Sequence, residues 1–223
     1  MPSLPDWRLR DCILCDIKPF VIKKPVPAIE RELISLHSRA AADLQYIRKT
    51  IESSSSFTSV SGLGAILIGV SALGTAWLAG LLPSPQARLQ LWVAEAVLAA
   101  TLGLLATVKK ARRDGRDLSH PVSRRFLFNL VPPLLAGAAL TAAMAAAGNF
   151  EIMPGLWLLL YGTGVLTAGA FSIRVVPLMG LCFMGLGILT LLLSPGFHQI
   201  MMGVGFGGLH LLFGAVIARY YGG

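Results

Sequence analysis

Long apolar segments separated by short polar ones fill the chain from residue 57 to its C-terminal end. A helix needs roughly 20 apolar residues to cross about 30 Å of hydrocarbon. Six segments approach or reach this length, and each ends near a turn-forming or basic sequence. The pattern therefore predicts an all-α integral membrane protein whose domain at 57–221 is a six-transmembrane-helix bundle. The predicted spans are residues 57–82, 89–108, 126–147, 153–171, 175–193 and 200–218.

The boundary between the fourth and fifth spans follows from their combined length. Between Met153 and Leu193 the only charged residue is Arg174. A single helix over this stretch would be about twice as long as a bilayer requires. Two helices joined by a tight turn at residues 172–174 fit better. They place Pro177 in a first helical turn, where its missing N–H breaks no hydrogen bond.

Charge is concentrated in residues 1–56 and 109–125. Six spans place both regions and the C-terminus on one side of the membrane, with all of the 19 Lys and Arg except Arg88. The positive-inside rule then predicts that the N-terminal segment 1–56 and the C-terminus are cytoplasmic.

The first 25 residues hold no apolar signal-peptide core, so we expect a multi-pass protein of the cell (inner) membrane. The net charge of +8 fits these loops and anionic lipid, and we expect no nucleic-acid partner.

The odd-numbered spans share a pattern that indicates an internal repeat. A Phe precedes a Val-headed apolar stretch in each, at Phe57, Phe128 and Phe171, and the even-numbered spans end in basic residues. This pattern predicts three parallel helical hairpins, and parallel repeats are one known way to build transporters. Chance similarity is the alternative, because Gly, Pro, Leu and Ala are common in any membrane helix.

The N-terminal segment carries a helical pattern between two prolines and a serine-rich break. Its apolar residues recur at intervals of three and four, which is typical of an amphipathic helix and predicts one over residues 28–52. The apolar stripe consists of Ile29, Leu33, Leu36, Ala40, Leu44, Ile47 and Ile51. Three surfaces could cover it: a second copy of the chain, the membrane interface or the cytoplasmic loops of the bundle. We therefore expect a homo-oligomer or a partner membrane protein, in addition to the lipid bilayer.

Three polar residues within the predicted spans are candidates for binding a ligand or a proton. Glu95 is the only acidic residue in a span, and an ionisable group inside the membrane is costly and indicates function by default. Tyr161 lies at a similar depth, with His210 about one turn deeper. If the hairpins are repeats, the three converge on a central cavity. The alternatives are structural: Glu95 reaches the interface, packs on a neighbouring helix or pairs with Arg88, and His210 hydrogen-bonds to a neighbouring helix.

Two further groups of residues are candidates for contacts. A basic cluster after the second span is suited to anionic lipid or an acidic partner, although a topology signal explains it as well. The cluster consists of Lys109, Lys110, Arg112, Arg113, Arg116, Arg124 and Arg125. Cys12 and Cys15 form a lone CxxC, a weak metal candidate because a structural zinc site needs four ligands. We expect no cofactor, and the sequence carries no Walker A, HExxH, GxSxG or kinase motif.

Two functions fit these features. The first is a non-enzymatic accessory, scaffold or sensor component that docks a partner or self-associates through its N-terminal helix. It rests on that helix and on the many glycines of the first, fifth and sixth spans, which favour close helix packing. The second is a small transporter or channel, with proton coupling as one option, that uses Glu95, Tyr161 and His210. The first is favoured because polar groups within the spans are few.

Overall fold

The computed structural model describes residues 43–47, 60–113 and 121–221. The chain divides into two units, Met1–Ile51 and Glu52–Gly223. In the first unit, residues 43–47 are helical and exposed, and the amphipathic helix over residues 28–52 stays a prediction. The remainder of that helix lies outside the described residues, and so do Cys12 and Cys15.

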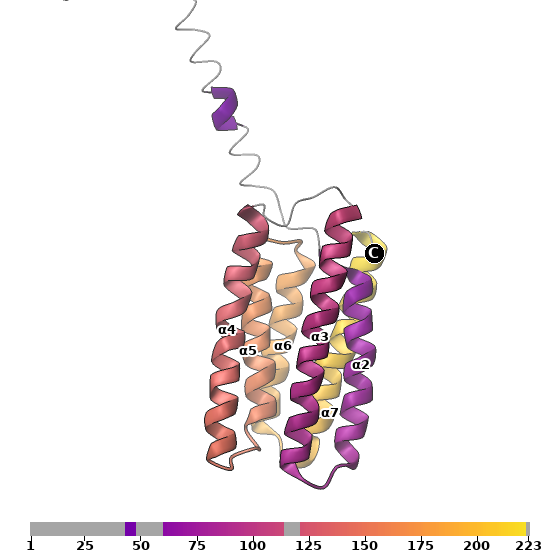
Figure 1. The fold of residues 1–223 in the computed structure, drawn as a ribbon, viewed down its shortest axis with the longest axis vertical. Helices are drawn as coiled ribbons and strands as arrows, with labels where there is room; N and C mark the ends of the chain where they lie inside the picture. The colour runs from indigo at the N-terminus through magenta and orange to yellow at the C-terminus, as the bar shows by residue number, and fades with distance from the viewer. Residues whose placement is uncertain (1–42, 48–59, 114–120, 222–223) are drawn as a thin grey trace, which may run out of the picture. The chain divides into compact units, whose positions relative to one another are not determined.

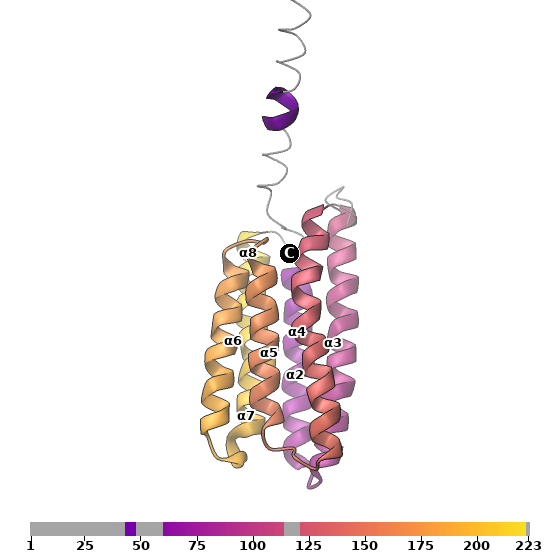
Figure 2. The same cartoon turned by 90° about the vertical axis from the view of Figure 1, so that its left-hand side faces the viewer.

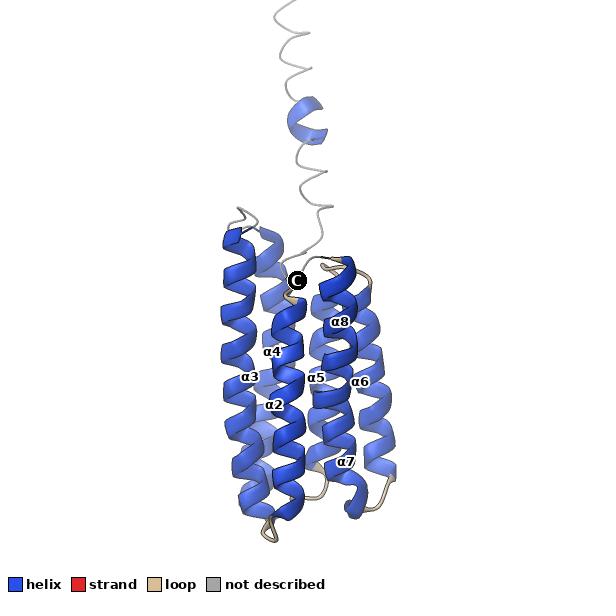
Figure 3. Cartoon of the chain, turned by 90° about the vertical axis from the view of Figure 1, so that its right-hand side faces the viewer, coloured by secondary structure: helices blue, strands red, loops and turns tan. Residues whose placement is uncertain are grey.

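The second unit is built from helices (Figure 1, Figure 3). They are α2 (Gly62–Leu81), α3 (Pro85–Arg113), α4 (Pro121–Ala146), α5 (Met153–Gly169), α6 (Val175–Leu192), η1 (Pro195–Phe197), α7 (His198–Met202), η2 (Gly203–Leu209) and α8 (His210–Tyr220). Among the described residues, five helices are long and apolar enough to cross a membrane, with Pro195–Tyr220 forming one of them. These five helices confirm the prediction of a helical, multi-pass membrane protein. Helix α5 has 17 residues and is shorter than these five.

The helices pack as two sets of three (Figure 1), and Figure 2 views them from the side of α4, α5 and α6. In one set, α2 lies between α3 and the C-terminal segment formed by η2 and α8. In the other, α5 lies between α4 and α6. Contacts of α5 with α7, and of α6 with η2 and α8, join the two sets. Helix α6 therefore packs chiefly on α5 rather than on α8, its partner in the predicted third hairpin.

Each set is held by a seam in which glycines seven residues apart bring two antiparallel backbones together. In the α5–α6 seam, a Cβ added to Gly162 would lie 2.7 Å from the backbone nitrogen of Met184 and 2.8 Å from the Gly180 carbonyl oxygen. In the α2–α8 seam, a Cβ on Gly69 would lie 2.9 Å from the Gly207 carbonyl oxygen. Such close approach increases van der Waals contact, which drives helix association in lipid. The glycine-rich sequence is therefore used for packing at these positions.

Helix α4 continues through Pro132 and Pro133. Pro133 has no N–H to donate to the carbonyl of Asn129, four residues earlier. The hydroxyl oxygen of Thr167, on α5, lies 3.1 Å from this carbonyl oxygen. A neighbouring helix thus supplies a polar contact where the proline removes one, which is how membrane helices tolerate proline.

The C-terminal segment departs from the regular helix that the apolar pattern predicts. Residues Gly203–Leu209 form a π-helix between α7 and α8. A Cβ added to Gly205 would come into contact with Leu158 of α5, so this turn lies close against the other helix set. Short π segments occur frequently at functional sites, and this one lies directly before His210.

Candidate functional site

The carboxyl group of Glu95 is buried between α3 and α2. Its side chain is 7% exposed. The hydroxyl oxygen of Ser71 lies 2.7 Å from Oε1, and the hydroxyl oxygen of Thr75 lies 3.1 Å from Oε2. Ser71 and Thr75 are four residues apart and share one face of α2, so both hydroxyls reach the same carboxyl group. Glu95 is therefore held by hydroxyl groups rather than by Arg88.

Arg88 has other partners at the end of the α2–α3 hairpin. Its Nε donates to the carbonyl oxygen of Leu82 at 2.7 Å, and its Nη2 donates to that of Pro83 at 3.5 Å. The guanidinium thus binds free carbonyls at the C-terminal end of α2, where a cation is favoured by the helix dipole. The structural alternative of a Glu95–Arg88 pair does not describe the arrangement observed.

Tyr161 and His210 meet at the boundary between the two helix sets. The hydroxyl oxygen of Tyr161 lies 2.8 Å from Nε2 of His210. The side chains of Phe183 and Phe206 surround the pair, with ring centroids 4.8 and 5.3 Å from that of Tyr161. Phe183 is fully buried and His210 is 3% exposed. The centre of the bundle is therefore filled by aromatic side chains around one polar contact.

The second ring nitrogen of His210, Nδ1, is buried. It forms no hydrogen bond with the described residues. A buried nitrogen without a well-formed partner is costly. Among the described residues, the imidazole of His210 is thus hydrogen-bonded through Nε2 only.

The three candidate residues form two sites rather than one. Tyr161 and His210 come together as the convergence hypothesis requires, whereas the carboxyl group of Glu95 hydrogen-bonds to α2. An aromatic contact links the sites: Trp92, one turn before Glu95 on α3, has its ring centroid 6.0 Å from that of Phe206. Trp92 is 5% exposed.

Sequence reasoning missed Ser71, Thr75, Trp92 and their partners. The indole Nε1 of Trp92 donates to the side-chain carbonyl of Gln199 at 2.9 Å, which ties α3 to α7. Two signals were available in the sequence: Ser71 and Thr75 have a spacing of four, and Trp92 and Glu95 a spacing of three. Neither signal says which helix the residues face.

Lys110 differs from the other residues of the basic cluster. It is buried, and its Nζ donates to the carbonyl oxygens of Val60 at 3.0 Å and Tyr221 at 3.1 Å. It thereby joins α3 to the start of α2 and the end of α8. The exposed members of the cluster are Lys109, Arg112, Arg113, Arg124 and Arg125. Arg116 lies outside the described residues.

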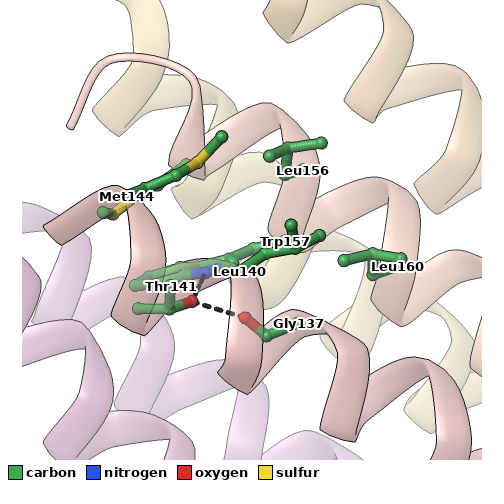
Figure 4. Close-up of a pocket in the computed structure, with 8 residues that line it drawn as sticks. Gly137, Leu140, Thr141, Met144, Leu156, Trp157 and Leu160 are labelled. Carbon is green, nitrogen blue, oxygen red and sulfur yellow. Dashed lines mark hydrogen bonds between the residues drawn. The ribbon is translucent and has the colours of Figure 1, made fainter. Parts of the chain in front are cut away.

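Two hollows lie away from these groups. The first lies between α4 and α5 and has no room for a water molecule. Figure 4 shows Trp157 across it, with its Nε1 donating to the hydroxyl of Thr141 at 2.7 Å. The second is a wide, shallow hollow of about 590 Å³ on the outer face of α2 and α7, beside Trp77 and Gln199. Neither is lined by Glu95, Tyr161 or His210.

Among the described residues, no group of three or more His, Cys, Asp and Glu side chains could hold a metal ion. In comparisons with known proteins, no protein-family model, curated protein or solved structure matches the chain.

Proposed function

We propose that the protein is a non-enzymatic accessory, scaffold or sensor component of the cell (inner) membrane that docks a partner or self-associates. The observation that supports this is the filled centre of the bundle. Tyr161, Phe183, Phe206 and His210 occupy the boundary between the helix sets, and glycine seams close each set. A bundle packed in this way suits a stable platform in the membrane better than an aqueous path.

The proposed topology has six spans, with α5 as the fourth. Helix α5 covers about 25 Å at 1.5 Å per residue and packs on α6 from Gly155, near its start, to Gly169 at its end. A helix paired along its whole length with a membrane-crossing neighbour crosses with it. The N-terminal segment and the C-terminus are then cytoplasmic by the charge distribution. A reporter fused after Gly223 should be active in the cytoplasm, and one inserted after Asn149 should not; the opposite result would overturn this topology.

The proposed docking element is the amphipathic helix at residues 28–52. Within the described part, Leu44 and Ile47 are 67% and 51% exposed, and their spacing of three places them on one helix face. Exposed apolar residues at helical spacing form the kind of face that a partner helix or a second copy covers. Self-association and a different membrane protein are both within this proposal.

The test is purification of the full-length protein from its native membrane. We expect a complex of fixed stoichiometry, or an oligomer of this chain, in the unmodified protein and its loss in the double variant Leu44→Ser, Ile47→Ser. The matched control is Asp43→Ser, Gln45→Ser, in the same helix segment, which should leave the complex intact. An unchanged complex in the apolar variant would refute docking through this helix.

A small transporter or channel is the second candidate, favoured by the burial of Glu95 in a helix that crosses the membrane. Glu95→Gln keeps the shape of the side chain but can no longer carry a charge. It should abolish proton-coupled uptake in membrane vesicles if the protein is such a transporter, and leave complex formation unchanged if it is an accessory component. Both outcomes can be measured in the same preparation.

A further inference from the structure

We propose that the C-terminal end of α3 binds the headgroup of an anionic phospholipid through Lys109 and Arg113, with the acyl chains of the lipid against an apolar ridge on the same face of the helix. This inference goes beyond the docking role. It assigns a ligand to the surface of the bundle itself and holds whether or not a partner binds residues 28–52.

Lys109 and Arg113 form a cationic pair on one face of α3. They are four residues apart in the helix, so their side chains are neighbours on its surface. Both are exposed, whereas Lys110 is buried and donates to two backbone carbonyls. Two like charges at a spacing of four repel each other. An anion bound between Lys109 and Arg113 would offset this repulsion.

No acidic side chain in the described part of the second unit neutralises the pair. The acidic residues there are Glu95 and Glu151. Glu95 precedes Lys109 by about 21 Å along the helix axis, at 1.5 Å per residue, and is bound to hydroxyls of α2. Glu151 lies between α4 and α5. In the sequence, residues 109–125 hold seven Lys and Arg and only two Asp, so this region has an excess of positive charge.

An exposed apolar ridge continues from the pair along the same face of α3. Residues four apart form such a ridge on a helix, and the positions before Lys109 are Leu105, Thr101, Val97 and Val93. The three aliphatic side chains are 61%, 64% and 44% exposed in that order. The Thr101 hydroxyl donates to the Val97 carbonyl oxygen at 2.8 Å, so it adds no free donor to the ridge.

The length of the ridge matches one leaflet of a bilayer. From Leu105 to Val93 it extends about 18 Å at 1.5 Å per residue, and half of the hydrocarbon core is about 15 Å thick. Helix α3 is itself long and apolar enough to cross a membrane. Acyl chains can therefore lie along the ridge while their headgroup lies beside the cations.

The cations and the ridge together favour a lipid over other anions. A free phosphate or an acidic protein would pair with Lys109 and Arg113 but would not use the ridge. An anionic phospholipid uses both parts. Anionic headgroups attract basic residues beside membrane helices, and an Arg side chain can donate two parallel hydrogen bonds to a phosphate group.

The two arginines at the start of α4 lack this arrangement and supply a matched control. Arg124 and Arg125 are adjacent in sequence, so they point in directions about 100° apart on the helix. The guanidinium of Arg124 lies 5.9 Å from the ring centroid of Phe128. Both arginines are exposed and belong to the same basic cluster, so replacing them removes the same number of charges without changing α3.

The experiment is native mass spectrometry of the full-length protein in mild detergent, after addition of phosphatidylglycerol or phosphatidylcholine. We expect the unmodified protein to retain phosphatidylglycerol in preference to phosphatidylcholine. The double variant Lys109→Gln, Arg113→Gln should bind phosphatidylglycerol about 30-fold more weakly, which corresponds to about 1 kcal/mol for each basic residue. The control Arg124→Gln, Arg125→Gln should lose far less. Equal losses in the two variants would mean that the lipid follows the total charge of the cluster, and would overturn the site on α3.

Two further measurements distinguish charge and ligand source. The exchange variant Lys109→Arg, Arg113→Lys keeps both charges and should keep the lipid, so a loss there would refute binding through charge. Inorganic phosphate should not displace phosphatidylglycerol, because it cannot contact the ridge; full displacement would show that the pair binds free phosphate instead. An unmodified protein that retains no phosphatidylglycerol would also overturn the proposal and would favour an acidic protein as the partner of the pair.

Discussion

The two glycine seams use the same packing device for contacts of very different sequence separation. The α5–α6 seam joins neighbouring helices across the short turn at residues 170–174. The α2–α8 seam joins the first and last helices of the bundle. Because the entropy lost in closing a loop grows with the length of the loop, forming this seam costs more conformational entropy than forming the α5–α6 seam.

Side-chain hydrogen bonds are unevenly distributed between the seams. Lys110 binds Val60 and Tyr221, which flank the two helices of the α2–α8 seam at one end. The middle helix of each set is also hydrogen-bonded to its outer helix, α2 to α3 through Glu95 and α5 to α4 through Trp157 and Thr167. The α5–α6 seam consists of two regular α-helices in direct backbone contact. We infer that the seam between distant helices relies on added polar contacts, whereas the seam between neighbours relies on backbone packing.

The largest effect is expected at the seam between neighbouring helices. A Cβ on Gly180 would lie 2.5 Å from the backbone nitrogen of Leu166, and backbone cannot move aside as a flexible side chain can. Gly180→Ala should lower the free energy of unfolding by about 1–3 kcal/mol, the usual range for overpacking. The measurement is unfolding in mixed detergent micelles, followed by circular dichroism. Gly185→Ala, on the same helix with open space around it, should have little effect. Equal losses in both variants would argue against the seam.

A smaller loss is expected at the seam between distant helices. A Cβ on Gly69 would lie 2.8 Å from the side chain of Leu211, and 2.9 Å from both the Gly207 carbonyl oxygen and the backbone nitrogen of Leu211, which are longer backbone contacts than the 2.5 Å at Gly180. Part of this clash is relieved by a side chain, so Gly69→Ala should cost about 1–2 kcal/mol in the same assay. Gly74→Ala, with no atom near its added Cβ, is the control. A greater loss for Gly69→Ala than for Gly180→Ala would reverse the proposed ranking.

Lys110 tests the polar contacts of the distant seam. Lys110→Met keeps the length of the side chain but removes the donor to Val60 and Tyr221. Because hydrogen bonds to charged groups are the stronger ones, the loss should be about 1–2 kcal/mol. Lys109→Met, at the exposed neighbouring position, should be close to neutral. If the two lysine variants unfold alike, Lys110 does not stabilise the seam.

The smallest effect is expected at the contact that joins the two helix sets. Tyr161→Phe removes the hydroxyl that binds His210 but keeps the aromatic packing around it. Double-mutant cycles between membrane helices give hydrogen-bond coupling energies of about 0.6 kcal/mol on average, and we expect a coupling energy of this size between Tyr161→Phe and His210→Phe. Tyr220→Phe, 70% exposed at the end of α8, is the control. A loss of several kcal/mol would mean that this polar contact, rather than the seams, holds the sets together.

The sequence predicted the membrane-protein class and the approximate position of the helices, because burial in lipid demands long uncharged segments whatever the tertiary arrangement. It did not predict that α3 extends from Pro85 to Arg113, beyond the apolar stretch at 89–108, since a helix can continue past the hydrocarbon into polar surroundings. The π-helix at Gly203–Leu209 was also missed, because its residues have the composition of an ordinary glycine-rich span.

Glu95, Tyr161 and His210 were identified from the sequence because polar groups are rare within apolar spans. Their partners were decided by tertiary structure alone. Helix rotation and the order of helices in space set which faces meet, and an apolar sequence with glycines on several faces permits more than one arrangement. Packing of the two seams placed Tyr161 against His210 and turned Glu95 towards Ser71 and Thr75. The bilayer thus requires each span to be long and apolar, and close contact between helix backbones decides which polar side chains meet.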